Sequence, residues 1–165
     1  MNKKIIAIVL VVALALCSLS AASTSGTSKK NAFSLGIGLG TNSGVAVKYG
    51  MGRFDLQANV GVAIRNSSFI FSGDLGAFYN FYDINFKAGS SKQTISLTTG
   101  PLVGMNAQNG SFGLDAIWAV GAEYTFNKVP VTMFMKLGAG CGILFADSVN
   151  TSFAFYGVLG AVYTF

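Results

Sequence analysis

The residues of this sequence that could do chemistry are a few isolated carboxylates, some lysines and one thiol. Paired carboxylates can act as general acid and base, and a hydroxyl or thiol becomes an effective nucleophile beside histidine. The 165 residues contain no histidine, so neither a Ser/His nor an Asp/His arrangement can form. We interpret Asp74, Asp115 and Glu123 instead as charge partners of basic residues. Those basic residues are Lys48, Arg65 and Lys136. We therefore expect no enzyme and no cofactor.

The other chemical features are weaker. A reactive cysteine needs a nearby cation and access to water, whereas Cys141 falls on an apolar face and is interpreted as a small apolar residue. The glycines at 36, 38 and 40 lie within a strand pattern that no helix follows, which excludes a dinucleotide-binding loop. We expect no nucleic acid partner, because the basic residues lie mainly in turns, where phospholipid headgroups are better neighbours.

Residues 1–22 have the composition of a secretory signal peptide: the basic start MNKK, the apolar run IIAIVLVVALAL and the small residues CSLSAAS. We expect cleavage after Ala22, which leaves a net charge of +3. A retained anchor is the alternative, but the apolar run is shorter than the ~20 residues of a spanning helix. A lipoprotein acylated at Cys17 is a second alternative, weakened by Leu16 before the cysteine. Residues 23–31 form a short polar lead, and residues 32–165 form one domain.

From Ala32 onwards, apolar residues recur at every second position, which is the pattern of β-strands. Short breakers between the segments predict sequential antiparallel hairpins, including a turn with Gly44 in the left-handed conformation and a two-residue turn at Met51–Gly52. The stretch DINFKAGSSKQ is predicted to be a loop. The eight predicted strands are Phe33–Thr41, Val45–Gly50, Arg53–Asn66, Phe69–Tyr82, Thr94–Asn106, Phe112–Phe126, Val129–Phe145 and Phe153–Phe165.

The two faces of these strands differ in a way that favours a membrane. In the third segment, one face carries Leu56, Val60 and Val62, while the opposite face carries Gln57 and Asn59. The apolar face is continuous and the opposite face is small and sparsely polar, as when one face contacts lipid and the other a narrow lumen. Backbone groups in lipid must all be paired, so the sheet has to close. We predict an all-β, eight-stranded antiparallel up-and-down transmembrane β-barrel. A soluble lipocalin-like barrel is the alternative, and it would need polar residues at 56, 58, 60, 62 and 64.

Aromatic residues form two bands along the predicted strands, as expected for girdles at the two membrane boundaries. The band at the end shared with the termini contains Tyr49, Phe54, Phe81, Tyr82, Tyr124, Phe126, Tyr163 and Phe165. The opposite band contains Phe69, Phe71, Phe112, Phe145, Phe153 and Phe155. Most basic residues lie at the first end, which we predict to be periplasmic.

This architecture, across the whole of residues 32–165, resembles the small eight-stranded outer-membrane β-barrels, the group of OmpX, the membrane domain of OmpA, and OmpW. The ending LGAVYTF resembles the signal read by the barrel-assembly machinery, with Gly160, Tyr163 and Phe165 at the matching positions. Leu159 departs from the pattern, because a polar residue usually precedes that glycine. The resemblance implies location in a bacterial outer membrane, insertion by that machinery and contact with outer-membrane lipid. It does not imply one function.

The lumen-facing residues allow three functions. A polar set predicts a side-chain plug and a structural or surface role: Lys48, Asp55, Gln57, Asn59, Arg65, Asp74, Asn80, Asp115, Glu123 and Lys136. Nearer the outer mouth, an apolar set among glycines predicts a hollow for a small hydrophobic ligand, as the OmpW resemblance implies: Ile70, Leu102, Ile117, Leu144, Tyr156 and Val158. Adhesion through the short outward loops is the third possibility, and their small area ranks it last.

Overall fold

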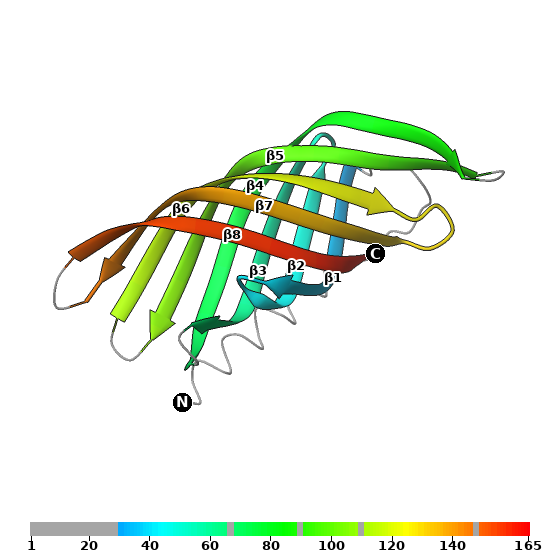
Figure 1. Cartoon of the computed structure of the whole chain (residues 1–165). Coiled ribbons are helices and arrows are strands. Elements are labelled where there is room, and N and C mark those ends of the chain that lie inside the picture. Colours follow the sequence, from blue (N-terminus) through cyan, green and yellow to red (C-terminus); the bar gives the residue numbers. More distant parts are fainter. Residues whose placement is uncertain (1–29, 66–67, 89–90, 109–110, 147–148) are drawn as a thin grey trace.

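Eight antiparallel strands form a closed barrel in the computed structural model of this protein (Figure 1). The structure describes residues 30–65, 68–88, 91–108, 111–146 and 149–165, so the predicted signal peptide lies outside the described residues. The strands are β1 (Lys30–Gly40), β2 (Ser43–Met51), β3 (Phe54–Arg65), β4 (Ser68–Ala88), β5 (Ser91–Gln108), β6 (Ser111–Thr125), β7 (Val131–Phe145) and β8 (Val149–Thr164). No helix within the described ranges is long and apolar enough to cross a membrane.

Each strand pairs with its neighbours in the chain, and the first strand pairs with the last. The β1–β8 seam runs from Ser34 opposite Thr164 to Gly40 opposite Val158. The prediction of eight up-and-down strands in a closed ring is therefore confirmed. The β1–β2, β3–β4, β5–β6 and β7–β8 connections meet at one end, which we call the loop end. The other three connections and the end of β8 meet at the opposite end, which we call the C-terminal end (Figure 1).

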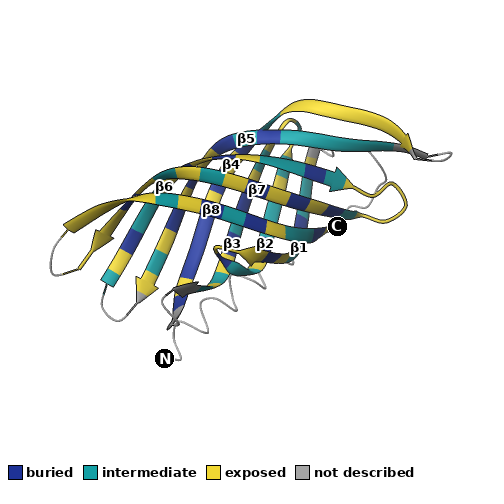
Figure 2. Cartoon of the chain, viewed as in Figure 1, coloured by how far each residue is buried: buried dark blue, intermediate teal, exposed yellow. Residues whose placement is uncertain are grey.

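Side chains alternate between the inside and the outside of this ring, as the period of a strand requires. Figure 2 shows the resulting bands of buried and exposed residues along β6, β7 and β8. On β7, Phe134 and Lys136 are buried, whereas Met135 and Leu137 are exposed. The inward and outward faces are those that the alternation of residue types predicts.

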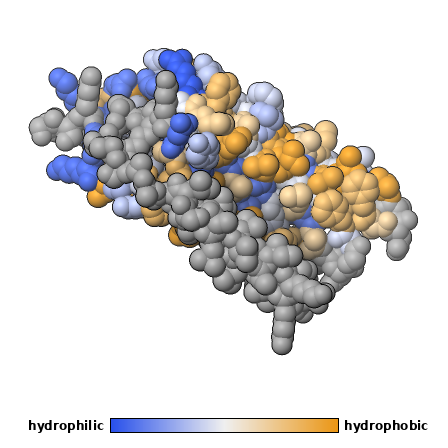
Figure 3. All heavy atoms as spheres, turned by 180° about the vertical axis from the view of Figure 1, so that it is seen from behind, coloured by the Kyte–Doolittle hydropathy of each residue, from blue (hydrophilic) through white to orange (hydrophobic). Residues whose placement is uncertain are grey.

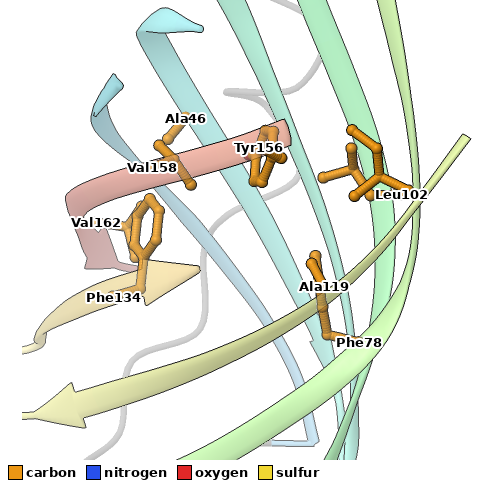
Figure 4. Close-up of a cluster of buried hydrophobic side chains, with 9 residues drawn as sticks. Ala46, Phe78, Leu102, Ala119, Phe134, Tyr156, Val158 and Val162 are labelled. Atoms are coloured by element: carbon orange, nitrogen blue, oxygen red, sulfur yellow. The ribbon is translucent and has the colours of Figure 1, made fainter. Parts of the chain in front are cut away.

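The interior contains a packed apolar cluster as well as polar groups. Figure 4 shows side chains from opposite walls of the barrel gathered in the lumen, with Phe134 beside Val162 and Phe78 beside Ala119. The buried cluster consists of Ala46, Phe78, Leu102, Ile117, Ala119, Phe134, Tyr156, Val158 and Val162. An eight-stranded barrel is just wide enough for side chains to fill it. The side chains of the buried cluster fill the lumen of this barrel in the same way.

The β4–β5 hairpin is the largest departure from the predicted elements. The stretch DINFKAGSSKQ was expected to be a loop, but β4 continues to Ala88, β5 begins at Ser91, and Ile84 lies opposite Ile95. The register shifts between Asn80 and Tyr82, where Phe81 is the extra residue of a bulge. The extra residue is left unpaired, and a bulge of this kind bends its strand and increases the local twist. The pairing of β3 with β4 ends at Phe54 opposite Tyr79, so the hairpin projects past β3 (Figure 1).

Two predicted turns are wrong in detail. Gly44 is not a left-handed turn residue: it belongs to β2 and pairs with Gly38 and Gly61, while Thr41 and Asn42 form the turn. The β2–β3 turn is formed by Gly52 and Arg53, not by Met51–Gly52, and Gly52 has a φ of 75°. As a result Lys48 pairs with Gln57, and Asp55 pairs with Gly50. The observed register of β2 and β3 differs from the predicted register by two residues. A shift by an even number of residues leaves every side chain on its predicted face.

The seam can be tested through a glycine at which the two strands approach closely. A Cβ at Gly36 would lie 1.9 Å from the backbone oxygen of Ala161 on β8, a distance that the backbone can relieve only by moving. We expect Gly36→Ala to lower the midpoint of urea unfolding measured after refolding into detergent. The matched control is Gly157→Ala, because a Cβ there would meet only the Leu137 side chain, at 3.5 Å. Equal stability of the two variants would contradict the close seam.

Candidate functional site

Four charged side chains form an ion-pair cluster across the barrel lumen. The Lys136 ammonium lies 2.9 Å from a carboxylate oxygen of Glu123, and its side chain is fully buried. Lys48 pairs with the other oxygen of the same carboxylate and lies 3.1 Å from Asp55. Two lysines and two carboxylates give the cluster no net charge. Balance of this kind is what allows charges to remain in a low-dielectric interior.

The register of the strands brings these groups together. Lys136 on β7 lies opposite Gly121 on β6, and a Cβ at Gly121 would lie 2.8 Å from the Lys136 Cγ. The missing side chain leaves room for the lysine to reach Glu123, two positions along β6. Lys48 reaches the same carboxylate from β2, on the far wall. The shared Glu123 therefore links two walls of the barrel through the lumen.

Two further contacts hold Lys136 in place. Its ammonium donates a hydrogen bond to the Thr98 hydroxyl at 3.2 Å, and it lies 3.7 Å from the centre of the Phe78 ring. A cation over an aromatic face is attracted by the ring quadrupole. Phe78 was not among the predicted site residues, whereas Thr98 is one of the polar residues that the alternation predicts to face the lumen. Their inward positions are readable from the alternation, but no sequence signal indicates their contact with Lys136.

A second polar cluster surrounds Asp74. The Asn59 amide nitrogen donates to one Asp74 oxygen at 2.6 Å, and the Asn42 amide nitrogen donates to the other at 2.7 Å. Asn59 also donates to the Tyr156 hydroxyl at 3.2 Å. Asp74 and Asn59 are opposite each other on β4 and β3, whereas Asn42 comes from the β1–β2 turn and was missed by the sequence analysis.

The remaining predicted polar residues do not join these clusters. Asp115 accepts a hydrogen bond from Asn106 at 2.9 Å, and Asn80 donates to Asp83 at 2.8 Å near the base of the projecting hairpin. Gln57 is buried, and its amide atoms have no hydrogen-bond partner among the described residues. The Arg65 side chain lies outside the described part of the structure. The predicted network is thus divided into separate groups, and among the described residues the lysines pair with Glu123 and Asp55.

The predicted apolar residues lie largely within the packed interior. Leu102, Ile117, Tyr156 and Val158 belong to the buried cluster and Ile70 is also buried, whereas Leu144 is 39% exposed. Neighbouring backbone occupies the inward side of some lumen glycines. A Cβ at Gly140 would lie 1.9 Å from the Ala116 oxygen, and one at Gly61 would lie 2.0 Å from the Ser43 oxygen. These two glycines allow close strand contact and leave no hollow beside them.

The C-terminal residues of the predicted assembly signal lie at the barrel seam. The Phe165 amide donates to the Phe33 oxygen at 3.0 Å, and the Phe165 ring lies 5.2 Å from the Tyr163 ring. A Cβ at Gly160 would meet the Ile37 oxygen and the Phe134 ring, so a larger residue would disturb both β1 and the interior. These contacts give the three residues a role in closing the barrel.

The described lumen residues include carboxylates and lysines but no histidine. Within them, no group of three or more histidine, cysteine or acidic side chains could hold a metal ion. The ion pairs of Lys48 and Lys136 with Glu123 connect opposite walls of the barrel, and their charges are balanced. Comparison of the chain with protein-family models, with curated proteins and with solved structures gives no match.

The central position of Glu123 can be tested by removing its charge. We expect Glu123→Gln to lower the free energy of unfolding by about 3–5 kcal/mol, because Lys136 would remain buried without its partner. The measurement is urea unfolding of the refolded protein in detergent, with Asp83→Asn at an exposed position as the control. The double variant Glu123→Gln/Lys136→Met should recover part of the loss. A Glu123→Gln protein as stable as the wild type would contradict the proposed lock.

Proposed function

We propose that this chain is an integral β-barrel of a bacterial outer membrane, with a lumen closed by side chains and a structural or surface role. The observation that carries the proposal is the apolar outer surface of a closed barrel. Every strand contributes large apolar side chains that are at least 40% exposed: Ile37, Leu39, Val45, Met51, Leu56, Val60, Phe71, Leu75, Val103, Met105, Trp118, Val120, Met135, Leu137, Phe155 and Leu159. Soluble monomers rarely expose apolar patches larger than a few hundred Å². Acyl chains are the environment that suits this surface.

The distribution of polarity along the barrel axis supports a membrane-spanning orientation. Figure 3 shows hydrophobic residues over the middle and one end of the visible face, with hydrophilic residues gathered at the opposite end. Rings that are exposed or half-buried occur in pairs towards both ends. Tyr124 and Phe126 lie 4.7 Å apart at the C-terminal end, and Phe112 and Phe145 lie 6.4 Å apart at the loop end. Paired bands of this kind suit the two headgroup regions of a bilayer.

The polar groups on the outer surface also fit a lipid environment. Trp118 is 61% exposed, yet its indole nitrogen donates to the Thr99 hydroxyl at 2.9 Å. That hydroxyl in turn donates to the Ala119 backbone oxygen at 3.2 Å. In water neither group would need a protein partner, whereas in lipid an unpaired donor costs several kcal/mol. The sheet itself satisfies both donors.

The closed lumen supports a structural or surface role over transport. The ion pairs among Lys48, Glu123 and Lys136 cross the interior, and the apolar cluster fills space beside them (Figure 4). The packing of Leu102, Ile117 and Val158 into that cluster leaves the predicted hydrophobic hollow without specific support. We also propose that the barrel-assembly machinery inserts the chain and that the C-terminal end of the barrel faces the periplasm.

Fractionation with gel electrophoresis tests the location. We expect the protein in the outer-membrane fraction and its unheated form to migrate differently from its boiled form, because a closed sheet embedded in detergent resists unfolding by dodecyl sulfate. A detergent-free monomer recovered in the periplasmic extract would contradict the proposal.

An arginine on the outer face tests the contact with lipid. Val120 is 55% exposed and lies within the apolar belt, so we expect Val120→Arg to destabilise the barrel in liposomes by about 2–4 kcal/mol. The control is Val149→Arg at the loop-end start of β8, where the cost should be at most about 1 kcal/mol near the membrane boundary. Urea unfolding in lipid vesicles measures both. Equal, near-neutral effects would indicate a surface that faces water.

A further inference from the structure

The distal part of the β4–β5 hairpin projects from the C-terminal end of the barrel as a two-stranded ribbon. The pairing of β3 with β4 ends at Tyr79, and the pairing of β5 with β6 ends at Ile95. β4 continues from Tyr79 to Ala88, a length of roughly 30 Å at about 3.3 Å per residue (Figure 1). Residues 81–87 are all exposed (Figure 2). Two strands alone gain little stability in water, so a surface that covers one face would stabilise the ribbon.

A bulge turns the large apolar residues of this part of β4 to the outside. Asn80 lies opposite Thr98, whose side chain is buried in the lumen. After the extra residue Phe81, Tyr82 lies opposite Leu97, which has the outward position next to Thr98. Directly opposite residues share a face of the sheet, so Tyr82 faces outward. Regular alternation from Asn80 would have placed it on the lumen side.

The outward face of the ribbon is apolar. Tyr82, Ile84 and Phe86 on β4 are each at least 40% exposed on this face. Leu97 and Ile95 on β5 lie opposite the first two of them. The face belongs to the same side of the sheet as the outer surface of the barrel, so it extends the apolar belt past the ends of the neighbouring strands.

The opposite face of the ribbon is polar and is hydrogen-bonded within itself. The Ser96 hydroxyl donates to the Asp83 carboxylate at 2.6 Å, and the Thr94 hydroxyl donates to the Asn85 amide oxygen at 2.8 Å. Lys87 follows on the same face of β4 and is exposed. This face suits water, and the ribbon is therefore amphipathic with the period of a strand.

A hydrogen bond connects the outward face to the aromatic band at the C-terminal end. The Tyr124 hydroxyl donates to the side-chain oxygen of Gln93 at 2.8 Å, and the centres of the Tyr124 and Phe126 rings lie 4.7 Å apart. Gln93 lies opposite Phe86 on the ribbon. The outward face of the ribbon is thus held beside rings that suit the headgroup region of a bilayer.

We propose that the ribbon beyond Phe81 is an interfacial anchor that lies on the phospholipid surface at the C-terminal end of the barrel. Tyr82, Ile84 and Phe86 insert among the headgroups, and the opposite, polar face meets water. An amphipathic helix lies in a bilayer interface in this way, and the ribbon presents the same two faces. The inference rests on the proposed function and adds a partner for this hairpin, the lipid leaflet beside it.

Two features favour lipid over a protein as the partner. The apolar face continues the outer surface of the barrel and is not a separate patch on another side of the molecule. Exposed basic residues also surround the base and end of the ribbon: Arg53, Lys87 and Lys128. Basic groups close to a bilayer are attracted by anionic headgroups.

Fluorescent labels on neighbouring residues test which face meets lipid. Cys141→Ala removes the cysteine that remains after the predicted signal peptide, and Ile84→Cys, Asn85→Cys or Leu75→Cys then adds one thiol for a nitrobenzoxadiazole label. The proteins are refolded into vesicles of phosphatidylethanolamine and phosphatidylglycerol, with and without spin-labelled acyl chains. We expect the spin-labelled lipid to quench the emission at 84 and 75. Aqueous iodide should quench the matched control at 85. Phe86→Cys and Lys87→Cys are a second pair that should repeat this contrast.

The label at Leu75, in the apolar belt, separates this inference from the proposed function. Lipid quenching at 75 together with iodide quenching at 84 would place the ribbon in water and overturn the anchor. Equal lipid quenching at 84 and 85 would overturn it too, because the two faces would not differ. Protection of 84 from both quenchers would indicate a protein cover, such as a second copy of the chain, and would also contradict it. Absence of lipid quenching at 75 would contradict membrane insertion itself, and the anchor with it.

Discussion

Pairing of β1 with β8 is the constraint on which the rest of this structure depends. Seven residue pairs, from Ser34–Thr164 to Gly40–Val158, join the ends of the sheet and remove its free edges along the seam. Without them the apolar face would belong to an open sheet, whose unpaired backbone groups cannot enter lipid. The close approach of Gly36 to Ala161 shows how tightly the two strands meet. The outer apolar surface and the enclosed lumen both follow from this closure.

Closure also decides how the interior is built. A ring of eight strands encloses space for side chains and little else, so inward positions hold small residues, packed apolar side chains or polar groups. Lys48 and Lys136 both pair with the Glu123 carboxylate. This carboxylate takes the place of the water that would otherwise solvate the two ammonium groups. The same geometry places Asp74 near the loop end, where the amide nitrogens of Asn42 and Asn59 donate to its carboxylate. One level of the lumen is therefore held by ion pairs, and another by amide–carboxylate hydrogen bonds.

Much of the fold was predictable, because alternation with period two is a local property of the sequence. It identified eight strands, their inward and outward faces, and a set of inward charges that includes Glu123, Lys48 and Lys136, but not which of these charges would pair. Details that depend on pairing between strands were not predictable. Beyond a bulge at Phe81, β4 stays paired with β5 as far as Ala88 opposite Ser91, in a stretch whose composition resembles a loop. The place of Asn42 beside Asp74 depends on how the β1–β2 turn folds over the lumen, and the alternation of the strands says nothing about turns.

The central claim is that the outward face contacts acyl chains, and the single tryptophan of the chain reports on it directly. Trp118 lies exposed on that face, hydrogen-bonded to Thr99. The most direct measurement is its fluorescence after reconstitution into vesicles of lipids brominated on their acyl chains, compared with quenching by aqueous acrylamide. Strong quenching by the brominated chains and protection from acrylamide is the result that this account predicts. Efficient quenching by acrylamide, with no effect of the brominated lipid, would place the same face in water and contradict it.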